Sequence, residues 1–217
     1  MQKIILGFHR FKERIYPKKK FLFKTLASKQ TPEILFITCA DSRVDPALIT
    51  QTDPGELFVI RNAGNIVPPY QSDDIGVSAS VEFAVNGLGV KHIIICGHSD
   101  CGAMKGVLKP SDLKNFPDVK KWIKYSAVVG NQFNLANALS QEEKLEILSE
   151  QNVLKQVENL KTFPYINTKL ETNKLSIHGW LYDIGHCSIK VFSNQRKSFT
   201  AIEDEYSGLT TDGSKNK

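Results

Sequence analysis

Two short polar motifs in this chain carry residue types that bind metal ions or act as nucleophiles. The first, "CADSR", places a thiol, a carboxyl and a guanidinium at alternate positions from Cys39 to Arg43. The second, "HSDC", runs from His98 to Cys101, and His98 lies 59 positions after Cys39. Thiolate, imidazole and carboxylate groups are all suitable ligands for Zn²⁺. Either motif alone is weak evidence, since a buried cysteine beside polar turn residues is the ordinary alternative.

Each motif directly follows an apolar run that is typical of a strand buried on both faces. "EILFITC" (33–39) leads into the first motif and "KHIIICGH" (91–98) contains the start of the second, with a further run, "ELFVIRN" (56–62), between them. Helical segments are predicted at 45–50, with Asp45 as N-cap and Pro46 at the first helical position, and at 73–89. This alternation predicts βαβ units around a parallel sheet.

In an open parallel sheet, ligands bind outside the carboxyl ends of the strands. Both motifs occupy that position, so we predict that their side chains meet in space and bind a metal ion. The candidate metal ligands are Cys39, Asp41, His98 and Cys101. Cys101 also begins a predicted helix, whose N-terminal amides favour the thiolate. A disulfide oxidoreductase would use a second thiol where this chain has histidine, and a papain-like Cys and His pair would leave "CADSR" without a role.

Arg43 is expected to act on the metal site through Asp41, because two positions of separation allow a bidentate contact between guanidinium and carboxylate. If Arg43 draws Asp41 away, three protein ligands remain and the fourth position is open to water, as in catalytic zinc sites. If Asp41 binds the metal instead, the site is closed. The residues alone leave both states open.

The rest of the chain is expected to complete a single domain over 1–217. Ser140 and Glu143 form a capping-box pattern that opens a helix through Leu160. Two β-rich runs in 174–192 predict a terminal pair of strands with an antiparallel edge strand. A polar tail from Thr200 is expected to be frayed. The fold class is therefore α/β, with a mostly parallel central sheet flanked by helices.

The N-terminal residues 1–28 are predicted to form a helical arm. Eight Lys and Arg against one acidic residue lie in 1–24, which accounts for the net charge of +5. Apolar residues recur between these charges at near-helical spacing, so we favour an amphipathic helix over an arm that binds nucleic acid. With 41% apolar residues, no run long enough to span a membrane and no secretory signal, the sequence predicts a cytoplasmic protein that contacts neither membrane nor nucleic acid.

Longer stretches of the sequence resemble the β-class carbonic anhydrases, and within them a plant-type-like bacterial subgroup. The resemblance rests on "CADSRVDP", "GELFVIRNAGNIVPPY", "SASVEFAV", "ICGHSDCGAMKG" and "HGWLYDI", and covers roughly residues 2–193. It implies an enzyme with one zinc ion per chain that interconverts carbon dioxide and bicarbonate by means of a zinc-bound hydroxide. It also implies self-association as dimers or higher even oligomers, with the N-terminal arm packed on a partner subunit.

The resemblance assigns roles to individual residues. It implies that Cys39, His98 and Cys101 bind zinc, and that Asp41 and Arg43 form the catalytic pair that controls the fourth position. The implied substrate-pocket residues are Gln30, supplied across a dimer interface in plant-type members, Phe58, Phe83 and Gly102.

The sequence departs from the family pattern at two places. Phe83 stands where a tyrosine is usual, which removes one hydroxyl from the pocket. Arg61 and Tyr182 match two residues of a regulatory bicarbonate site, but Phe36 replaces its tryptophan, which lowers the expectation of that control. A zinc-stabilised binding protein, with Asp41 permanently on the metal, and a hydrolase of another small linear molecule such as carbon disulfide remain the alternative functions.

Overall fold

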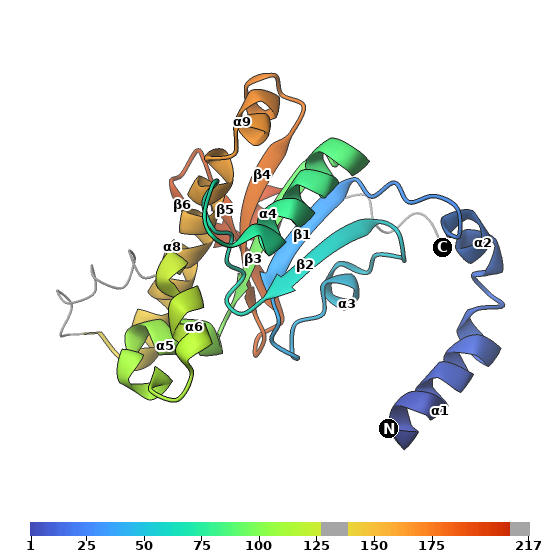
Figure 1. The fold of residues 1–217 in the computed structure, drawn as a ribbon, viewed down its shortest axis with the longest axis horizontal. Helices are drawn as coiled ribbons and strands as arrows, with labels where there is room; N and C mark the ends of the chain where they lie inside the picture. The colour runs from blue at the N-terminus through green and yellow to red at the C-terminus, as the bar shows by residue number, and fades with distance from the viewer. Residues whose placement is uncertain (127–138, 209–217) are drawn as a thin grey trace.

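A computed structural model of the protein describes residues 1–126 and 139–208. A six-stranded sheet in the order β2-β1-β3-β4-β5-β6 forms its centre (Figure 1). The strands are β1 (Ile34–Cys39), β2 (Leu57–Asn62), β3 (His92–His98), β4 (Ser176–Asp183), β5 (Ser188–Ser193) and β6 (Ser198–Ala201). Pairing is parallel from β2 to β4 and antiparallel from β4 to β6. The predicted α/β class and mostly parallel sheet are confirmed.

The helices follow the predicted alternation with some differences in detail. In the body they are α3 (Pro46–Thr50), α4 (Ile75–Glu82), α5 (Gly102–Leu108), α6 (Pro117–Trp122), α8 (Gln141–Lys161), α9 (Pro164–Glu171) and α10 (Ile202–Glu205), with a 3₁₀ turn, η3 (Pro110–Leu113). The segment predicted as one helix over 73–89 is α4 followed by a π-helix, η2 (Phe83–Leu88), which ends where Gly89 adopts a φ of 72°.

Both predicted helix caps are present. The Asp45 side chain accepts a hydrogen bond from the Leu48 amide at the start of α3. Ser140 and Glu143 form the reciprocal capping box of α8, with bonds of 3.1 Å and 2.7 Å. The sequence of 111–129 also predicts helical structure, interrupted at Pro117; α6 and most of η3 lie in this segment, and residues 127–129 fall outside the described part of the chain.

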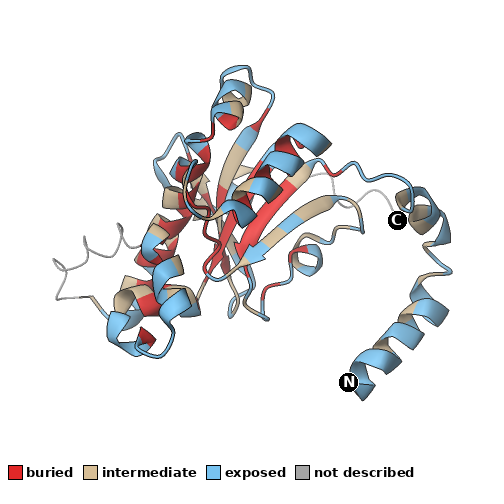
Figure 2. Cartoon of the chain, viewed as in Figure 1, coloured by how far each residue is buried: buried red, intermediate tan, exposed pale blue. Residues whose placement is uncertain are grey.

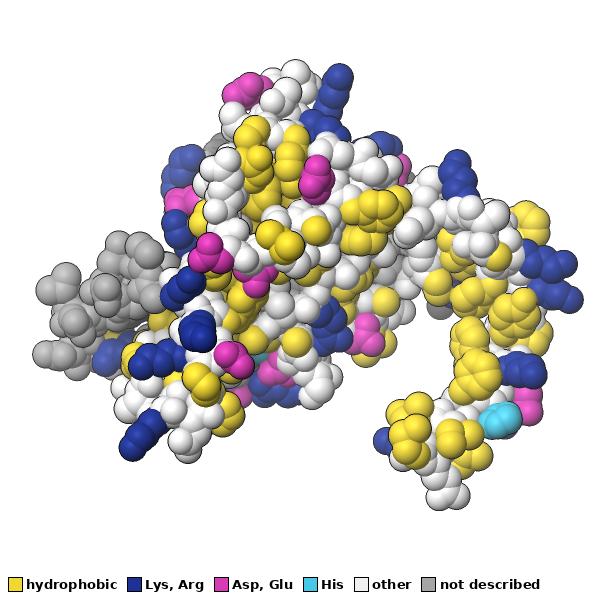
Figure 3. Space-filling model, viewed as in Figure 1, with side chains coloured by type: hydrophobic (Ala, Val, Ile, Leu, Met, Phe, Trp, Pro, Cys, Tyr) yellow, Lys and Arg dark blue, Asp and Glu magenta, His cyan; other side chains and the backbone are white. Residues whose placement is uncertain are grey.

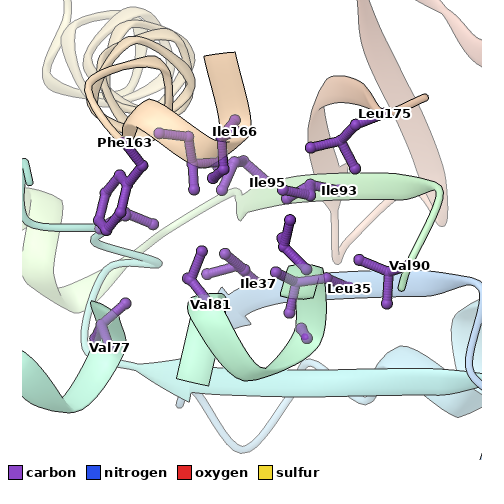
Figure 4. Close-up of a cluster of buried hydrophobic side chains, with 14 of the residues drawn as sticks. Leu35, Ile37, Val77, Val81, Val90, Ile93, Ile95, Phe163, Ile166 and Leu175 are labelled. Carbon is purple, nitrogen blue, oxygen red and sulfur yellow. The ribbon is translucent and has the colours of Figure 1, made fainter. Parts of the chain in front are cut away.

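One face of the sheet carries the largest buried cluster, because strand residues two apart point to the same side. Leu35 and Ile37 of β1 and Ile93 and Ile95 of β3 are fully buried on this face. Figure 4 shows them between side chains of α4 and side chains from residues 163–175. Helix α8 also approaches this face closely, since a Cβ at Gly97 would lie 2.8 Å from Val153. Helices α4, α8 and α9 therefore fix the relative positions of β1 and β3.

The C-terminal segment differs from the prediction. Residues 198–201 form β6, which pairs with β5 through Val191 and Thr200, and 202–205 form α10. The expectation of a frayed tail from Thr200 is therefore wrong for residues 200–205, while 209–217 lie outside the described residues. The strand forms because Phe199 packs on Phe192, with ring centroids 5.6 Å apart, and this contact is not visible in the local sequence.

The N-terminal arm projects from the body (Figure 1), and most of its residues are exposed (Figure 2). It consists of α1 (Gln2–Arg10), a π-helix η1 (Phe11–Ile15) and α2 (Lys20–Leu26). The predicted helical arm is thus observed, as three short helical segments. Figure 3 shows yellow apolar groups along it. The strongly exposed apolar residues of the arm are Met1, Ile4, Ile5, Leu6, Phe8, Ile15 and Phe21.

Among the described residues, no helix combines the length and the apolar character that crossing a bilayer requires.

Candidate metal centre

The two sequence motifs meet at the carboxyl ends of β1 and β3. These strands are neighbours, and β2 lies on the other side of β1, so the chain reverses the direction of strand addition between β2 and β3. Such a switch point is where open parallel sheets place their binding sites. Cys39 ends β1, His98 ends β3, and Cys101 is the N-cap residue of α5.

Three of the predicted ligands form one buried cluster. The Sγ atoms of Cys39 and Cys101 and a ring nitrogen of His98 lie within 4.8 Å of one another. The three residues are 5%, 1% and 0% exposed. Met104 of α5 and Leu148 of α8 pack beside the thiols and exclude water from that side. Two sulfurs and one nitrogen in this arrangement suit a tetrahedral zinc ion with one further position.

The hydrogen bonds of His98 provide a test of whether the site fits a metal. Its Nδ1 is 2.8 Å from the Ser99 carbonyl oxygen, so Nδ1 carries the proton and donates to that carbonyl. Its Nε2 is buried and has no hydrogen-bond partner among the described residues. A buried nitrogen without a partner is costly, whereas a metal-bound histidine usually donates its other N–H to a carbonyl in this way. The donor set therefore fits a zinc ion.

The two thiols influence each other strongly because both are buried. The contact with Cys101, with a smaller contribution from the Gly64 amide, lowers the pKa of Cys39 well below its usual value. The same contact with the Cys39 thiolate, together with burial, raises the pKa of Cys101. The backbone amides of Ala103 and Met104 favour the Cys101 thiolate, as the sequence predicted, but they do not outweigh the neighbouring negative charge. The lowered pKa of Cys39 favours its thiolate, which is the form that binds metal.

The Gly64 backbone also contacts the cluster. Its N–H donates to Cys39 Sγ at 3.3 Å. Gly64 has a φ of 81°, and an added Cβ would lie 2.9 Å from the Cβ of Ala103 in α5. A side chain at this position would therefore be strained and would push α5 away from the loop.

Arg43 holds Asp41 at the edge of the cluster. Its Nε donates to Asp41 Oδ1 at 3.0 Å and its Nη2 donates to Oδ2 at 2.9 Å, which is the predicted bidentate contact. The Arg43 guanidinium keeps the pKa of Asp41 far below its usual range. Asp41 Oδ2 is 4.0 Å from His98 Nε2, so Asp41 adjoins the cluster without belonging to it. Asp41 as a metal ligand stays a prediction.

Two further charged residues fix this arrangement, and sequence reasoning gave neither of them this role. Asp100 accepts from Arg43 Nη1 at 3.1 Å and also forms an ion pair with Lys105. Arg61 donates from Nε to the Cys39 carbonyl at 3.2 Å and from Nη2 to the Asp41 carbonyl at 2.7 Å. Arg61 therefore holds the backbone of the first motif, whereas the sequence suggested it only for bicarbonate regulation.

The predicted pocket residues are divided between two places. Gly102 directly follows Cys101 and has open space where a side chain would begin. Phe58 pairs with Leu35, and the Cys39–Asn62 pair lies four residues further along the two strands. At about 3.3 Å per residue, Phe58 is therefore about 13 Å from Cys39 along the strand direction. Phe83 packs near Phe58, with centroids 6.0 Å apart, and is 51% exposed. Gln30 is exposed in the segment before β1. The chain does not bring Gln30, Phe58 or Phe83 to its own metal cluster.

Comparisons with known proteins agree on one family. The family model described as carbonic anhydrase matches residues 34–189. A carbonic anhydrase of Pseudomonas aeruginosa is 45% identical over 204 residues, covering 94% of this chain and 93% of the relative. Carbonic anhydrase 1 of Escherichia coli O157:H7 is 45% identical and covers 93% of this chain and 92% of the relative.

Solved structures give the class within that family. The structure of the β-carbonic anhydrase CcaA matches with a TM-score of 0.90 and 42% identity, over 93% of this chain and 91% of that one. One of the tetrameric β-carbonic anhydrases from Sordaria macrospora matches with a TM-score of 0.81 and 32% identity, over 92% and 98%. On the combined evidence of motifs, cluster geometry and these similarities, the chain belongs to the β-carbonic anhydrase family.

Proposed function

We propose that this protein catalyses the zinc-dependent, reversible hydration of carbon dioxide to bicarbonate and a proton. Family membership supports the reaction. The observation that carries the proposal in this chain is the buried Nε2 of His98, which lies beside the thiols of Cys39 and Cys101 and has no hydrogen-bond partner within 1–126 and 139–208. These three residues would hold one zinc ion per chain.

The metal supplies the chemistry that the side chains lack, since a bound zinc ion lowers the pKa of a water molecule from 15.7 to about 7. With zinc in place, Asp41 would accept a hydrogen bond from the metal-bound water and orient it toward the substrate. Asp41 can do so because both its oxygens are held by Arg43 at the edge of the cluster. Of the two states that the sequence leaves open, we therefore propose the one in which Arg43 holds Asp41 off the metal and the fourth position is open to water.

A second copy of the chain would complete the substrate pocket. Gly102 is beside the cluster, but Gln30, Phe58 and Phe83 lie elsewhere in the same chain. We propose that a partner subunit supplies these three in an even oligomer, with Phe58 and Phe83 as the apolar wall for carbon dioxide. The exposure of Phe83 and of the apolar arm residues supports such an interface. We also propose a cytoplasmic location, which the presence of all four cysteines as free thiols supports.

The decisive experiment measures zinc content and carbon dioxide hydration on the same purified sample at pH 8.5. One zinc ion per chain with fast hydration is expected. A sample that contains one zinc ion per chain but does not hydrate carbon dioxide would overturn the proposed enzymatic function and favour a zinc-stabilised binding protein. Adding carbon disulfide as a second substrate distinguishes the related hydrolase, because that enzyme would release sulfide.

A further inference from the structure

Helix α8 carries an unusual row of buried polar side chains on the face that packs against the sheet. Asn152, Gln156 and Asn159 are 1%, 0% and 3% exposed. They bond to one another: Gln156 Nε2 donates to Asn152 Oδ1 at 2.9 Å, and Asn159 Nδ2 donates to Gln156 Oε1 at 3.2 Å. Ser126 Oγ also donates to Asn152 Oδ1, at 2.5 Å. Buried polar groups persist where they are fully hydrogen-bonded, and such networks fix one geometry.

This row binds the backbone of the loop that follows β2. Asn152 Nδ2 donates to the Gly64 carbonyl at 3.0 Å. The Val67 amide donates to Gln156 Oε1 at 2.9 Å, and Asn159 Nδ2 donates to the Val67 carbonyl at 2.8 Å. Each polar side chain of the row thus holds a backbone group that would otherwise be buried without a partner.

Gly64 joins this network to the metal centre. Its carbonyl accepts from Asn152 while its amide donates to Cys39 Sγ. Its positive φ and the close approach of Ala103 leave this residue little freedom to compensate if one contact is lost. The orientation of the Gly64 residue is therefore set from the α8 side.

We propose that Asn152 is a positioning residue of the metal centre, which holds Gly64 so that the Gly64 amide donates to the metal-binding thiolate of Cys39. Outer contacts of this kind orient metal ligands, and their loss typically costs about 10- to 100-fold in metal affinity or activity. This inference deepens the proposed function and rests on Cys39 as a zinc ligand.

The test is the substitution Asn152→Asp, which nearly preserves shape. It keeps the Oδ1 acceptor for Ser126 and Gln156 but removes the N–H donor to Gly64. Asn159→Asp is the matched control, since it removes an amide donor from the same helix and the same loop at Val67 instead of Gly64. We expect zinc affinity, measured by chelator competition, to fall about tenfold or more in Asn152→Asp and less than threefold in Asn159→Asp.

A spectroscopic measurement reports the inferred hydrogen bond directly. In the full chain loaded with ¹¹³Cd, the wild-type Gly64 amide proton should show coupling to the metal through the N–H···S bond. Asn152→Asp should lose this coupling and Asn159→Asp should keep it. Retained coupling in Asn152→Asp, or an equal loss of affinity in both variants, would overturn the inference.

A second variant and a wild-type control complete the test. Should Asn152→Asp fail to fold, Ser126→Ala removes one donor to Asn152 and should weaken zinc binding in the same direction by a smaller factor, and unchanged affinity there counts against the inference. Wild-type protein that takes up no zinc would overturn the proposed function itself, whereas normal uptake in wild type and in Asn152→Asp would overturn only the role of Asn152.

Discussion

The metal cluster and the region around Phe58 and Phe83 differ in how completely a single chain forms them. At the cluster, Cys39, His98 and Cys101 are buried. Neighbouring groups such as the Ser99 carbonyl, the Gly64 amide and Arg61 fix their positions. Away from the cluster, Phe83 is half exposed, and Gln30 is exposed in the segment before β1. A single chain therefore contains the metal-binding residues, while the substrate pocket, as we propose it, depends on assembly.

The comparison predicts that zinc binding and assembly can be separated by substitution. The largest effect is expected for Cys101→Ala, which removes one of the two thiols. Zinc measured by atomic emission should be lost, and carbon dioxide hydration should fall to the uncatalysed level. Cys187→Ala, at an exposed cysteine outside the cluster, should change neither. Activity retained by Cys101→Ala would exclude Cys101 as a ligand.

Arg43→Gln should keep zinc but close the metal site. Without the bidentate contact, Asp41 is free to move the short distance to the metal, and activity should fall by about 100-fold. The absorption spectrum of the Co²⁺-substituted protein should then show a fourth protein ligand. Lys105→Gln, which alters the ion pair with Asp100 but leaves Asp41 bound to Arg43, is the control. A wild-type cobalt spectrum in Arg43→Gln would contradict the proposed role.

Removing residues 1–28 should affect assembly more than metal binding. The deletion takes away the exposed apolar residues of the arm and Lys19, which pairs with Asp53 of the body. We expect a smaller oligomer by light scattering, full zinc content, and about tenfold lower activity because the pocket residues are misplaced. Phe8→Asp should also reduce the size of the oligomer, whereas Lys12→Gln should leave it unchanged. Loss of zinc together with the oligomer would show that the two regions are not independent.

Phe83→Tyr should give the smallest effect. It restores a hydroxyl to the predicted pocket without disturbing the cluster, and one new hydrogen bond would lower KM about threefold. Zinc content should be unchanged. A similar change in protein held as a monomer would show that Phe83 does not act across an interface.

The sequence predicts most of the features that depend on residues close together in the chain or on a regular pattern of apolar residues. The runs 33–39 and 91–98 are mostly apolar at their centres, and the polar motifs begin where these runs end, so the sequence alone predicts that the motifs form one cluster. The Arg43 and Asp41 contact is equally local. Resemblance to a family then supplied the reaction.

The sequence does not show features that depend on distant partners. Strand β6 forms through pairing with β5, and its Thr200 has little apolar character to mark it. The positions 152, 156 and 159 are spaced as i, i+4 and i+7, which is a core-facing pattern, but they hold amides where apolar residues are usual. That mismatch between pattern and residue type is the one sign from which the buried row of α8 could have been inferred.

The crossover between β2 and β3 has a consequence for the energetics of folding. Because it brings Cys39 and His98 together from positions 59 residues apart, a metal ion held by both acts as a cross-link between distant segments. Bringing the ends of so long a loop together costs chain entropy, and this cost grows with loop length. A metal ion that closes a long loop therefore offsets a larger entropy cost than one that closes a short loop. In this fold the ion that serves the chemistry also fastens the two central strands to each other.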